Sequence, residues 1–486
     1  MSVFILHQCC EYSENCAKTP RLSLHEHPAT IALKRRQVGL GTETNQPDVP
    51  NPICSVSYLM TIKSLLLGAA ASLTALAAAQ AADLPMTKGE AVEYVKVCSA
   101  FGPGFFYIPG SDTCLKIAGE IRADYRFYNQ SGDGIKANTK NDFGSDFYKQ
   151  NRDIHSSAFN TEARISFDAR TQTEFGLLRS FFQIRGISHP INWDSTKDTS
   201  GNTFSIKYAY IQFGGLTAGY AHSFFGFYDL DFGNTVWGPY YAQSNVVNLL
   251  AYTADFGSGF TATLSIEDGR DHRQNAFAKN QQGGQQIPDV VGQIRLKQDW
   301  GSVAVQAAAH QYRTAETIVP RENKWGYAVG GTLLVNIPVI DKGHFVIEGQ
   351  YADGALDYLG IGSSKLKGQD YFFNSNGGFD GGKGWSVTAE LGGNFAPQWG
   401  ANLVGAYIDT TYDKFSNLGD RKVKEYSLTG NVIYTIVKGL TVTGEVTYTH
   451  QTIDNLSYVP TAGVAAIARD AKSDFWMGGV RIKRTF

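Results

Sequence analysis

The feature that most constrains the fold is an alternation of apolar and polar residues with a period of two. In residues 115–127, the odd positions are apolar or glycine, whereas five of the six even positions are charged. Such a pattern separates the two faces of an extended strand, but it would be scattered around a helix. The same alternation recurs near 161–173 and 439–450. The sequence therefore predicts strands with one apolar face.

Sixteen such segments follow one another to the end of the chain. They lie near 115–127, 161–173, 176–187, 203–213, 215–223, 247–256, 259–268, 288–298, 301–312, 324–335, 343–352, 384–395, 399–409, 421–435, 439–450 and 473–486. Most have about ten residues or slightly more, which is the length of a tilted strand that crosses a membrane. Residues 82–486 contain no apolar run of the about eighteen residues that a membrane-spanning helix needs.

The connections between these segments alternate between short and long. The short links contain Glu174-Phe175, Gly214, Gly257-Ser258, Asp299-Trp300, Pro338, Pro397 and Lys438. The long links cover about 128–160, 188–202, 224–246, 269–287, 313–323, 353–383, 410–420 and 451–472. Tight turns at one rim and long loops at the other predict an up-and-down barrel with both chain ends at the turn side.

A bilayer is the environment that fits such a barrel. Unpaired backbone groups are costly in hydrocarbon, so a sheet can span a membrane only when it is closed. A barrel of this size leaves an aqueous channel, which suits charged inward faces. Tryptophans at both ends of the strands also indicate two aromatic girdles. We therefore predict an all-β fold: a 16-stranded antiparallel transmembrane β-barrel with short periplasmic turns and long extracellular loops, which acts as a pore.

The N-terminal part has the features of a targeting segment. Residues 60–81 contain Lys63, an apolar run and Ala79-Gln80-Ala81, which together make up a cleaved secretory signal peptide. Residues 1–59 carry four of the six cysteines without the spacing of a zinc site. We interpret them as a mis-assigned upstream extension, with translation starting at Met60. The expected organisation is 1–59 extension, 60–81 signal peptide, 82–114 N-terminal periplasmic-side segment and 115–486 barrel.

Charge and cysteine content narrow the partners and the compartment. Residues 82–486 contain 37 Lys and Arg and 40 Asp and Glu, so their net charge is −3, which excludes a polybasic protein that binds nucleic acid. Cys98 and Cys114 remain, with fifteen residues between them. An exported protein meets an oxidising compartment, so we expect these two cysteines to pair. Closing a loop of that size stabilises the fold by about 3 kcal/mol in the chain-entropy model.

Catalytic motifs are missing from the sequence. It contains neither a Gly-x-Ser-x-Gly elbow nor a His-Glu-x-x-His helix motif. We therefore expect a channel rather than an enzyme, with no cofactor and no metal. A substrate-specific channel, for example for sugars, remains an alternative, because residues 224–241 are rich in aromatic side chains. A plugged transporter would need about twenty-two strands and an N-terminal domain larger than residues 82–114.

Four stretches resemble the general porins of alphaproteobacterial outer membranes, of the rhizobial and Brucella type. They are AVEYVKVCSAFGPGFFYIPGSDTCLKIAGEIRADYRF, ARISFDARTQTEFGLLRSFFQIR, YIQFGGLTAGYAHSFFGF and the closing FWMGGVRIKRTF. The resemblance covers essentially all of 82–486. It implies a homotrimer, surrounded by outer-membrane lipid and lipopolysaccharide, that passes small hydrophilic solutes. It further implies that the third long loop, about 224–246, narrows the barrel and that the barrel-assembly machinery recognises Phe486.

Arginines on the polar faces of the first strands are the candidates for ion selectivity. If residues 161–187 form a hairpin with a two-residue turn, the numbers of opposite residues sum to 349. Arg170 then faces Arg179, and Arg164 faces Arg185. Like charges directly opposite each other are destabilising. A wall that keeps two such pairs therefore suggests a positive lining with a function.

The full set of predicted pore-lining residues includes acids on the third long loop. It comprises Arg122, Arg126, Arg164, Arg170, Arg179, Arg185, Asp229 and Asp231. Arginines on the wall and aspartates on the loop would create an electric field across the constriction. A second interpretation stays open, in which acids on the same strands neutralise the arginines and the charges only keep the wall wet. These acids are Glu120, Asp124, Glu162 and Asp168.

Overall fold

The structure is a computed structural model of the chain. It describes residues 96–132, 155–188, 202–228, 234–273, 283–318, 321–361, 368–416, 419–458 and 467–486. The chain divides into two units, Met1–Glu90 and Ala91–Phe486, and all described residues belong to the second. The predicted upstream extension and signal peptide lie outside the described residues and stay predictions.

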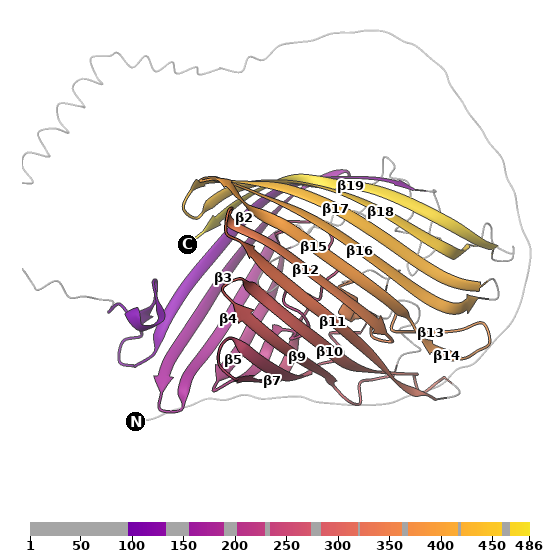
Figure 1. The fold of residues 1–486 in the computed structure, drawn as a ribbon, viewed down its shortest axis with the longest axis horizontal. Helices are drawn as coiled ribbons and strands as arrows, with labels where there is room; N and C mark the ends of the chain where they lie inside the picture. Colours follow the sequence, from indigo (N-terminus) through magenta and orange to yellow (C-terminus); the bar gives the residue numbers. More distant parts are fainter. Residues whose placement is uncertain are drawn as a thin grey trace, which may run out of the picture. The chain divides into compact units, whose positions relative to one another are not determined.

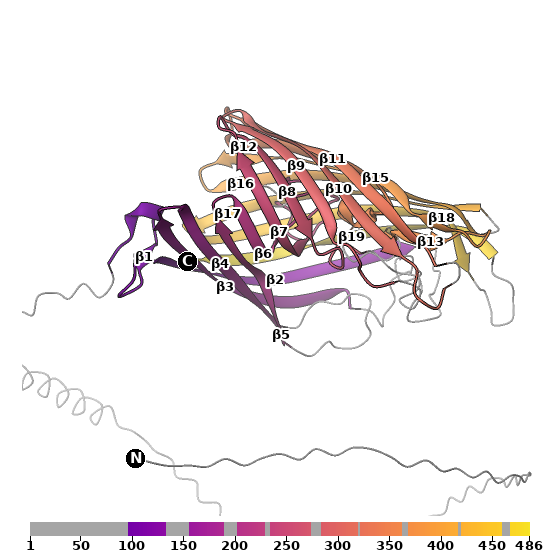
Figure 2. The ribbon, with the colours of Figure 1, turned by 90° about the horizontal axis from the view of Figure 1, so that it is seen from below.

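Sixteen long strands form a closed antiparallel barrel (Figures 1 and 2). They are β2 (Cys114–Gly132), β3 (Ser157–Thr173), β4 (Gly176–Ser188), β5 (Asn202–Phe213), β6 (Leu216–His222), β7 (Val246–Asp255), β8 (Phe260–Glu267), β9 (Asp289–Gln298), β10 (Gly301–Arg313), β11 (Asn323–Ile337), β12 (Asp341–Asp353), β15 (Lys383–Ala396), β16 (Trp399–Ser416), β17 (Gly419–Val437), β18 (Leu440–Tyr458) and β19 (Ile467–Thr485). Each strand pairs with the next in this order, and β19 pairs with β2. The predicted fold is confirmed.

Five short elements complete the described structure. They are η2 (Ser99–Phe101), β1 (Phe106–Tyr107), η4 (Leu356–Leu359), β13 (Tyr371–Phe373) and β14 (Phe379–Gly381). Strand β1 pairs with the start of β2, and β13 pairs with β14 in a separate hairpin. Within the described part of the chain, no helix has the length and apolar character needed to cross a membrane.

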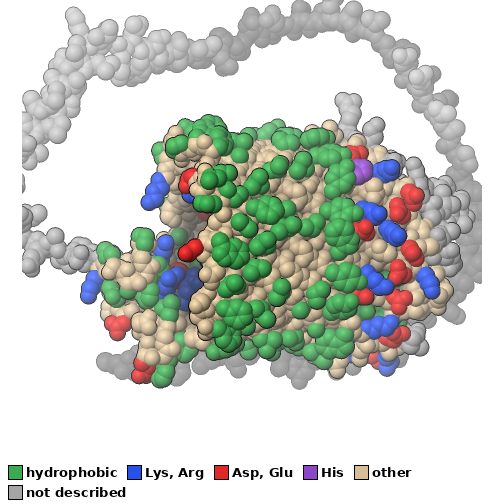
Figure 3. All heavy atoms as spheres, in the orientation of Figure 1, with side chains coloured by type: hydrophobic (Ala, Val, Ile, Leu, Met, Phe, Trp, Pro, Cys, Tyr) green, Lys and Arg blue, Asp and Glu red, His purple; other side chains and the backbone are tan. Residues whose placement is uncertain are grey.

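The outer surface of the barrel is apolar and its interior is polar. Along β2, the side chains of Ile117 and Ile121 are 45% and 48% exposed, whereas Asp124 is 3% exposed. Figure 3 shows a broad band of apolar side chains across the strands, with charged side chains gathered towards the ends. An exposed apolar surface of this extent is stable when lipid covers it. The predicted alternation therefore places its apolar face outward, towards the membrane.

Exposed tryptophans border this apolar band. Trp300 and Trp399 lie at short turns, Trp325 and Trp385 lie near the other ends of their strands, and Trp476 lies midway along β19. Each of the five side chains is more than 40% exposed. Aromatic side chains are favoured at the two membrane–water interfaces, so this arrangement agrees with two girdles.

Several strands run further than the alternation predicts. Strand β16 ends at Ser416, β17 begins at Gly419, and these two residues pair, so the predicted long loop over 410–420 is wrong. Likewise, β2 continues to Gly132 and β18 continues to Tyr458. Beyond the lipid both faces of a strand meet water, so the apolar alternation ends there. Backbone pairing does not depend on this alternation and continues.

The turn rim is close to the prediction but differs in detail. The link predicted as Gly214 alone consists of Gly214 and Gly215. Both have positive φ angles, +56° and +90°, which suit glycine in a tight turn. The link predicted over Gly257-Ser258 comprises the four residues between β7 and β8.

Cys98 and Cys114 form the predicted disulfide, with their Cα atoms 6.0 Å apart. Both cysteines are buried together with Phe105, against the partly buried rings of Phe101 and Tyr107. The disulfide therefore fastens the segment before β2 to the first residue of that strand. Its loop closure and this small apolar cluster together stabilise one end of the barrel wall.

Phe486 completes the seam between the first and last strands. Its backbone N–H donates to the Gly119 carbonyl at 3.0 Å, and the Gly119 N–H donates to the Phe486 carbonyl at 2.9 Å. A Cβ atom at Gly119 would collide with the Phe486 ring. Glycine at this position therefore lets the terminal ring lie against β2. The assembly role of Phe486 stays a prediction.

Candidate functional site

The connection between β6 and β7 contributes a segment that contacts the inner faces of the strands. Its described residues, 223–228 and 234–245, are called the inner segment. Phe225, Phe227, Tyr228 and Tyr241 on this segment are at most 2% exposed, although none of them lies in a strand. A buried segment without strand pairing needs other partners for its backbone N–H groups. Inward carboxylates of the strands provide them.

Glu348 on β12 fastens both ends of the inner segment. Its carboxylate is fully buried and accepts hydrogen bonds from the backbone N–H groups of Phe227 and Tyr228, both at 3.2 Å. It also accepts one from the N–H of Gln243 at 3.3 Å. A Cβ atom at Gly226 would collide with this carboxylate, so glycine is required for the close approach.

Glu445 on β18 holds the middle of the inner segment. It accepts hydrogen bonds from three successive backbone N–H groups, those of Val236 at 2.6 Å, Trp237 at 2.7 Å and Gly238 at 2.9 Å. Successive amides that converge on one oxygen pair form a concave anion-binding arrangement. A Cβ atom at Gly238 would collide with Thr429. The fold of the segment and the position of the carboxylate therefore match each other.

Trp237 joins the inner segment to the β19–β2 seam. Its indole Nε1 donates to an Asp124 carboxylate oxygen on β2 at 3.1 Å. The guanidinium groups of Arg126 and Arg481 lie 5.2 and 5.5 Å from the centre of its ring system. Arg481 also donates two hydrogen bonds of 2.7 Å to Asp124. The indole thus bridges the gap between the inner segment and the wall on this side.

Between the inner segment, η4 and β16, buried side chains fill the lumen. One buried cluster joins Phe225 and Tyr241 of the inner segment to Leu356 and Leu359 of η4 and to Tyr412 of β16. The connection that contains η4 therefore also folds inward. The resemblance implied only the third long loop in this position, and the packing shows that a second connection supports it from behind.

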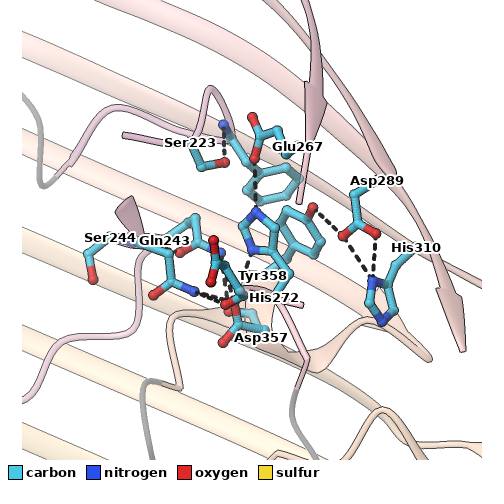
Figure 4. Close-up of polar contacts among 12 residues, drawn as sticks. Ser223, Gln243, Ser244, Glu267, His272, Asp289, His310, Asp357 and Tyr358 are labelled. Carbon is cyan, nitrogen blue, oxygen red and sulfur yellow. Dashed lines mark hydrogen bonds and ion pairs between the residues drawn. The ribbon is translucent and has the colours of Figure 1, made fainter. Parts of the chain in front are cut away.

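A buried histidine links these inward connections (Figure 4). The imidazole of His272 lies between carboxylate oxygens of Glu267, 2.8 Å from Nε2, and Asp357, 3.1 Å from Nδ1. Its ring stacks on Tyr358 with a centroid distance of 4.4 Å. The Tyr358 hydroxyl donates to Asp289 on β9 at 2.8 Å. The strands and the inward connections thus share one polar network.

The charge on His272 holds two carboxylates that contact the inner segment. Burial opposes protonation, but hydrogen bonds and charge attraction from Asp357 and Glu267 outweigh it and raise the pKa of His272 to about 10. Glu267 accepts a hydrogen bond from the Phe224 N–H at 3.1 Å, and Asp357 accepts one from the Asn245 side chain. The histidine is therefore cationic at neutral pH and stabilises both ends of the inner segment.

The six predicted arginines lie on β2, β3 and β4, on the polar side of these strands. The predicted register is correct, because Arg170 pairs with Arg179 and Arg164 pairs with Arg185. Asp168 accepts two hydrogen bonds from each of Arg170 and Arg179, at 2.8–3.0 Å. One shared carboxylate thus holds the first like-charge pair together.

The other acids of these strands also contact arginines, as the second interpretation expected. Glu120 pairs with Arg122, and Glu162 pairs with Arg164. Neutralisation is nevertheless incomplete, because these strands carry six arginines and only four acids, and β19 adds two further cations that the sequence reasoning missed. The group called the basic wall has eight basic and four acidic side chains, a surplus of four positive charges: Arg122, Arg126, Arg164, Arg170, Arg179, Arg185, Arg481, Lys483, Glu120, Asp124, Glu162 and Asp168.

A cavity of about 640 Å³ lies between the basic wall and the inner segment. Arg122, Arg164, Lys207 and Arg295 contribute to its lining, and no carboxylate is found among the described residues that line it. Four cations therefore face one open space. The predicted counter-charges Asp229 and Asp231 lie outside the described residues, so their part in a transverse field stays a prediction.

A closed barrel with a lipid-facing exterior and a charged, open lumen defines a transmembrane channel of the outer-membrane type. Residues 83–479 match the model of the porin subfamily, and the chain belongs to this family of outer-membrane porins. The resemblance found in the sequence is thereby confirmed.

Two relatives and one solved structure illustrate the match. The chain is 29% identical over 445 residues to porin Omp2b of Brucella suis, covering 88% of this chain and all of the relative. It is 30% identical over 436 residues to porin Omp2b of Brucella canis, with the same coverage. The outer-membrane channel DcaP of Acinetobacter baumannii is similar in fold, with a TM-score of 0.54 and 14% identity over 78% of this chain and 99% of that one.

Proposed function

We propose that this porin forms a water-filled channel through which small hydrophilic solutes and ions diffuse passively. The observation that carries the proposal is the open cavity between the basic wall and the inner segment. In this proposal the inner segment sets the width of the passage, and the wall sets its charge. The channel acts without catalysing a reaction, in keeping with its family.

The surplus of positive charge on the basic wall favours anions over cations. Charges that line a narrow, water-filled passage concentrate ions of the opposite sign. Arg170 and Arg179 can be tested directly, because the double replacement Arg170→Glu and Arg179→Glu changes the wall charge by four units. The reversal potential in a salt gradient is expected to shift towards cation preference. An unchanged reversal potential would remove these two residues from the selectivity mechanism.

Ion current through the purified protein in a planar bilayer tests the channel itself. Neutral sugars at rising concentration are expected to lower the current only in proportion to the bulk conductivity. A saturable block by one sugar would instead support the second candidate function, a substrate-specific channel. Aromatic rings in the lumen favour this second candidate, since Phe181, Tyr208 and Tyr210 line the cavity and rings can stack on sugar faces.

The assembly state and the processing belong to the same proposal. We propose a homotrimer surrounded by outer-membrane lipid and lipopolysaccharide, exported with cleavage of residues 60–81 and without residues 1–59. Current steps grouped in threes would support the trimer. The position of Phe486 at the seam suits its proposed recognition by the barrel-assembly machinery. Deletion of Phe486 is expected to lower the amount of folded barrel in the outer membrane, and an unchanged amount would contradict this role.

A further inference from the structure

Three aromatic rings face the lumen on β4 and β5. The ring centroid of Phe181 lies 6.2 Å from that of Tyr208 and 5.3 Å from that of Tyr210. All three side chains line the cavity. The next residue on β4, Phe182, is 43% exposed on the lipid side and stacks on Phe167. A water-filled lumen is normally lined by polar side chains, so a cluster of rings on this face requires an explanation.

Cations lie over the faces of these rings. The guanidinium carbon of Arg179 is 5.2 Å from the Phe181 centroid and 5.6 Å from the Tyr210 centroid. Lys207 Nζ is 5.2 Å from the Tyr208 centroid. Cation–π contacts of this kind keep the rings in place and leave positive charge beside them.

Hydrogen bonds fix the same surface further. The Tyr208 hydroxyl lies 2.8 Å from His222 Nε2, and Arg179 donates to Gln212 at 2.9 Å. The rings and their cations are therefore largely preformed, which lowers the entropy cost of binding a solute.

The lining of the cavity includes further cations. Arg122 and Arg164 belong to the same lining, and Arg295 joins it from β9. Its volume of about 640 Å³ falls in the range of about 300–1,000 Å³ that is common for small-molecule sites. The lining thus offers ring faces and positive charge within one space that a single-ring solute can enter.

We propose that this cavity is a binding subsite for anions that carry an aromatic ring, such as aromatic carboxylates. The inference rests on the proposed channel function and adds a preferred class of solute. The ring of the solute stacks on Phe181 and Tyr210, and its carboxylate meets the cations of the lining. An aliphatic anion gains only a water-screened attraction, and a neutral ring gains no charge attraction from the cations of the lining.

Block of single-channel current by three small probes tests the subsite. The probes are benzoate, which has ring and charge, acetate, which has only the charge, and benzyl alcohol, which has only the ring. Benzoate is expected to block the current saturably, at a concentration about tenfold lower than acetate, the factor that one aromatic pair contributes, and also at a lower concentration than benzyl alcohol, which lacks the charge. Equal potency of acetate would show that charge alone acts, and equal potency of benzyl alcohol that the ring alone acts. Either result would overturn the subsite.

Matched variants locate the effect in the cavity. Phe181→Leu is expected to weaken the benzoate block about tenfold and to leave the effect of acetate unchanged. Phe182→Leu, on the lipid side of the same strand, is the control and is expected to keep the full block. If Phe181→Leu does not fold, Lys207→Gln replaces it and is expected to weaken benzoate more than benzyl alcohol. A full benzoate block in the folded variant would contradict the proposal.

The two proposals fail in different ways. A wild-type protein that conducts ions but does not distinguish the three probes removes the subsite and leaves the channel function intact. A folded barrel that carries no current removes both.

Discussion

Carboxylates project inward from both halves of the lumen, but they meet different partners. On β12, β15 and β18, Glu348, Glu390 and Glu445 are at most 2% exposed and accept hydrogen bonds from the inner segment. On β3, Asp168 is 8% exposed and accepts hydrogen bonds from Arg170 and Arg179 of the basic wall. The carboxylate thus fixes the shape of the lumen in the half formed by β12, β15 and β18, called the packed half. It adjusts the electric field in the half that contains β3 and the basic wall, called the wet half.

The carboxylates of the two halves therefore also contribute differently to the free energy of folding. A hydrogen bond to a charged group contributes about 1.5–3 kcal/mol, and a buried donor left without its partner loses that stabilisation in full. An ion pair in contact with water contributes only about 0–1 kcal/mol. Changes in the packed half should therefore alter the structure of the pore, whereas changes at the basic wall should alter its selectivity.

The largest effect is expected from Glu445→Gln. Three backbone donors would then share one neutral oxygen, and the attachment of the inner segment would weaken by about 3 kcal/mol or more. Single-channel conductance and the size-exclusion limit are expected to rise while the barrel still folds. Conductance equal to that of the wild-type protein would show that Glu445 does not hold the segment.

A smaller effect is expected from Trp237→Leu. This variant keeps the backbone N–H that Glu445 accepts but loses the indole contacts to Asp124, Arg126 and Arg481, worth about 2 kcal/mol. Solute uptake by liposomes is expected to show a higher size-exclusion limit, because a gap opens between the inner segment and the wall at the β19–β2 seam. Trp325→Leu, which alters a 53% exposed ring of the outer face, serves as the control. Equal limits for the two variants would contradict this sealing role.

High pH is expected to loosen the packed half by removing the charge of His272. Its pKa in the folded protein, about 10, lies above the ordinary value of 6.5. The stabilisation is therefore fully present below about pH 6.5 and is lost as the pH rises through about 10. Current fluctuations should increase above that pH. The current through the His272→Gln variant should fluctuate already at neutral pH, without a further increase at high pH. The same increase in both proteins would exclude His272 as its origin.

The smallest effect is expected from Asp168→Asn, the counterpart of Glu445→Gln in the wet half. The surplus on the basic wall rises from four to five positive charges, because the aspartate carboxylate no longer offsets Arg170 and Arg179. The reversal potential is expected to move slightly towards anion preference at unchanged conductance. A large change in conductance would mean that the wet half also shapes the pore.

The sequence predicts the barrel and its inward faces well, because both depend on local patterns. The period of two identifies which residues point inward, and the two-residue turn after Thr173 sets the register that places Arg164 opposite Arg185. Arg481 and Lys483 follow the same alternation on β19 and could have been found in this way. The alternation does not predict the end of β16, because the pattern stops where the strand leaves the lipid.

The attachment of the inner segment could not be predicted from the sequence. Alternation places Glu348 and Glu445 on inward faces, but their partners are distant in the chain. Glu445 and Trp237, for example, are 208 residues apart. Which amides reach which carboxylate depends on the path of a connection without periodic structure, and no local pattern encodes that path.

The most direct test of the account is the reversal potential of the wild-type protein in a potassium chloride gradient across a planar bilayer. An open passage along the basic wall predicts anion preference, which should weaken at high ionic strength because salt screens the wall charges. Cation preference, or no preference at low salt, would contradict the claim that the basic wall borders the path of the ions.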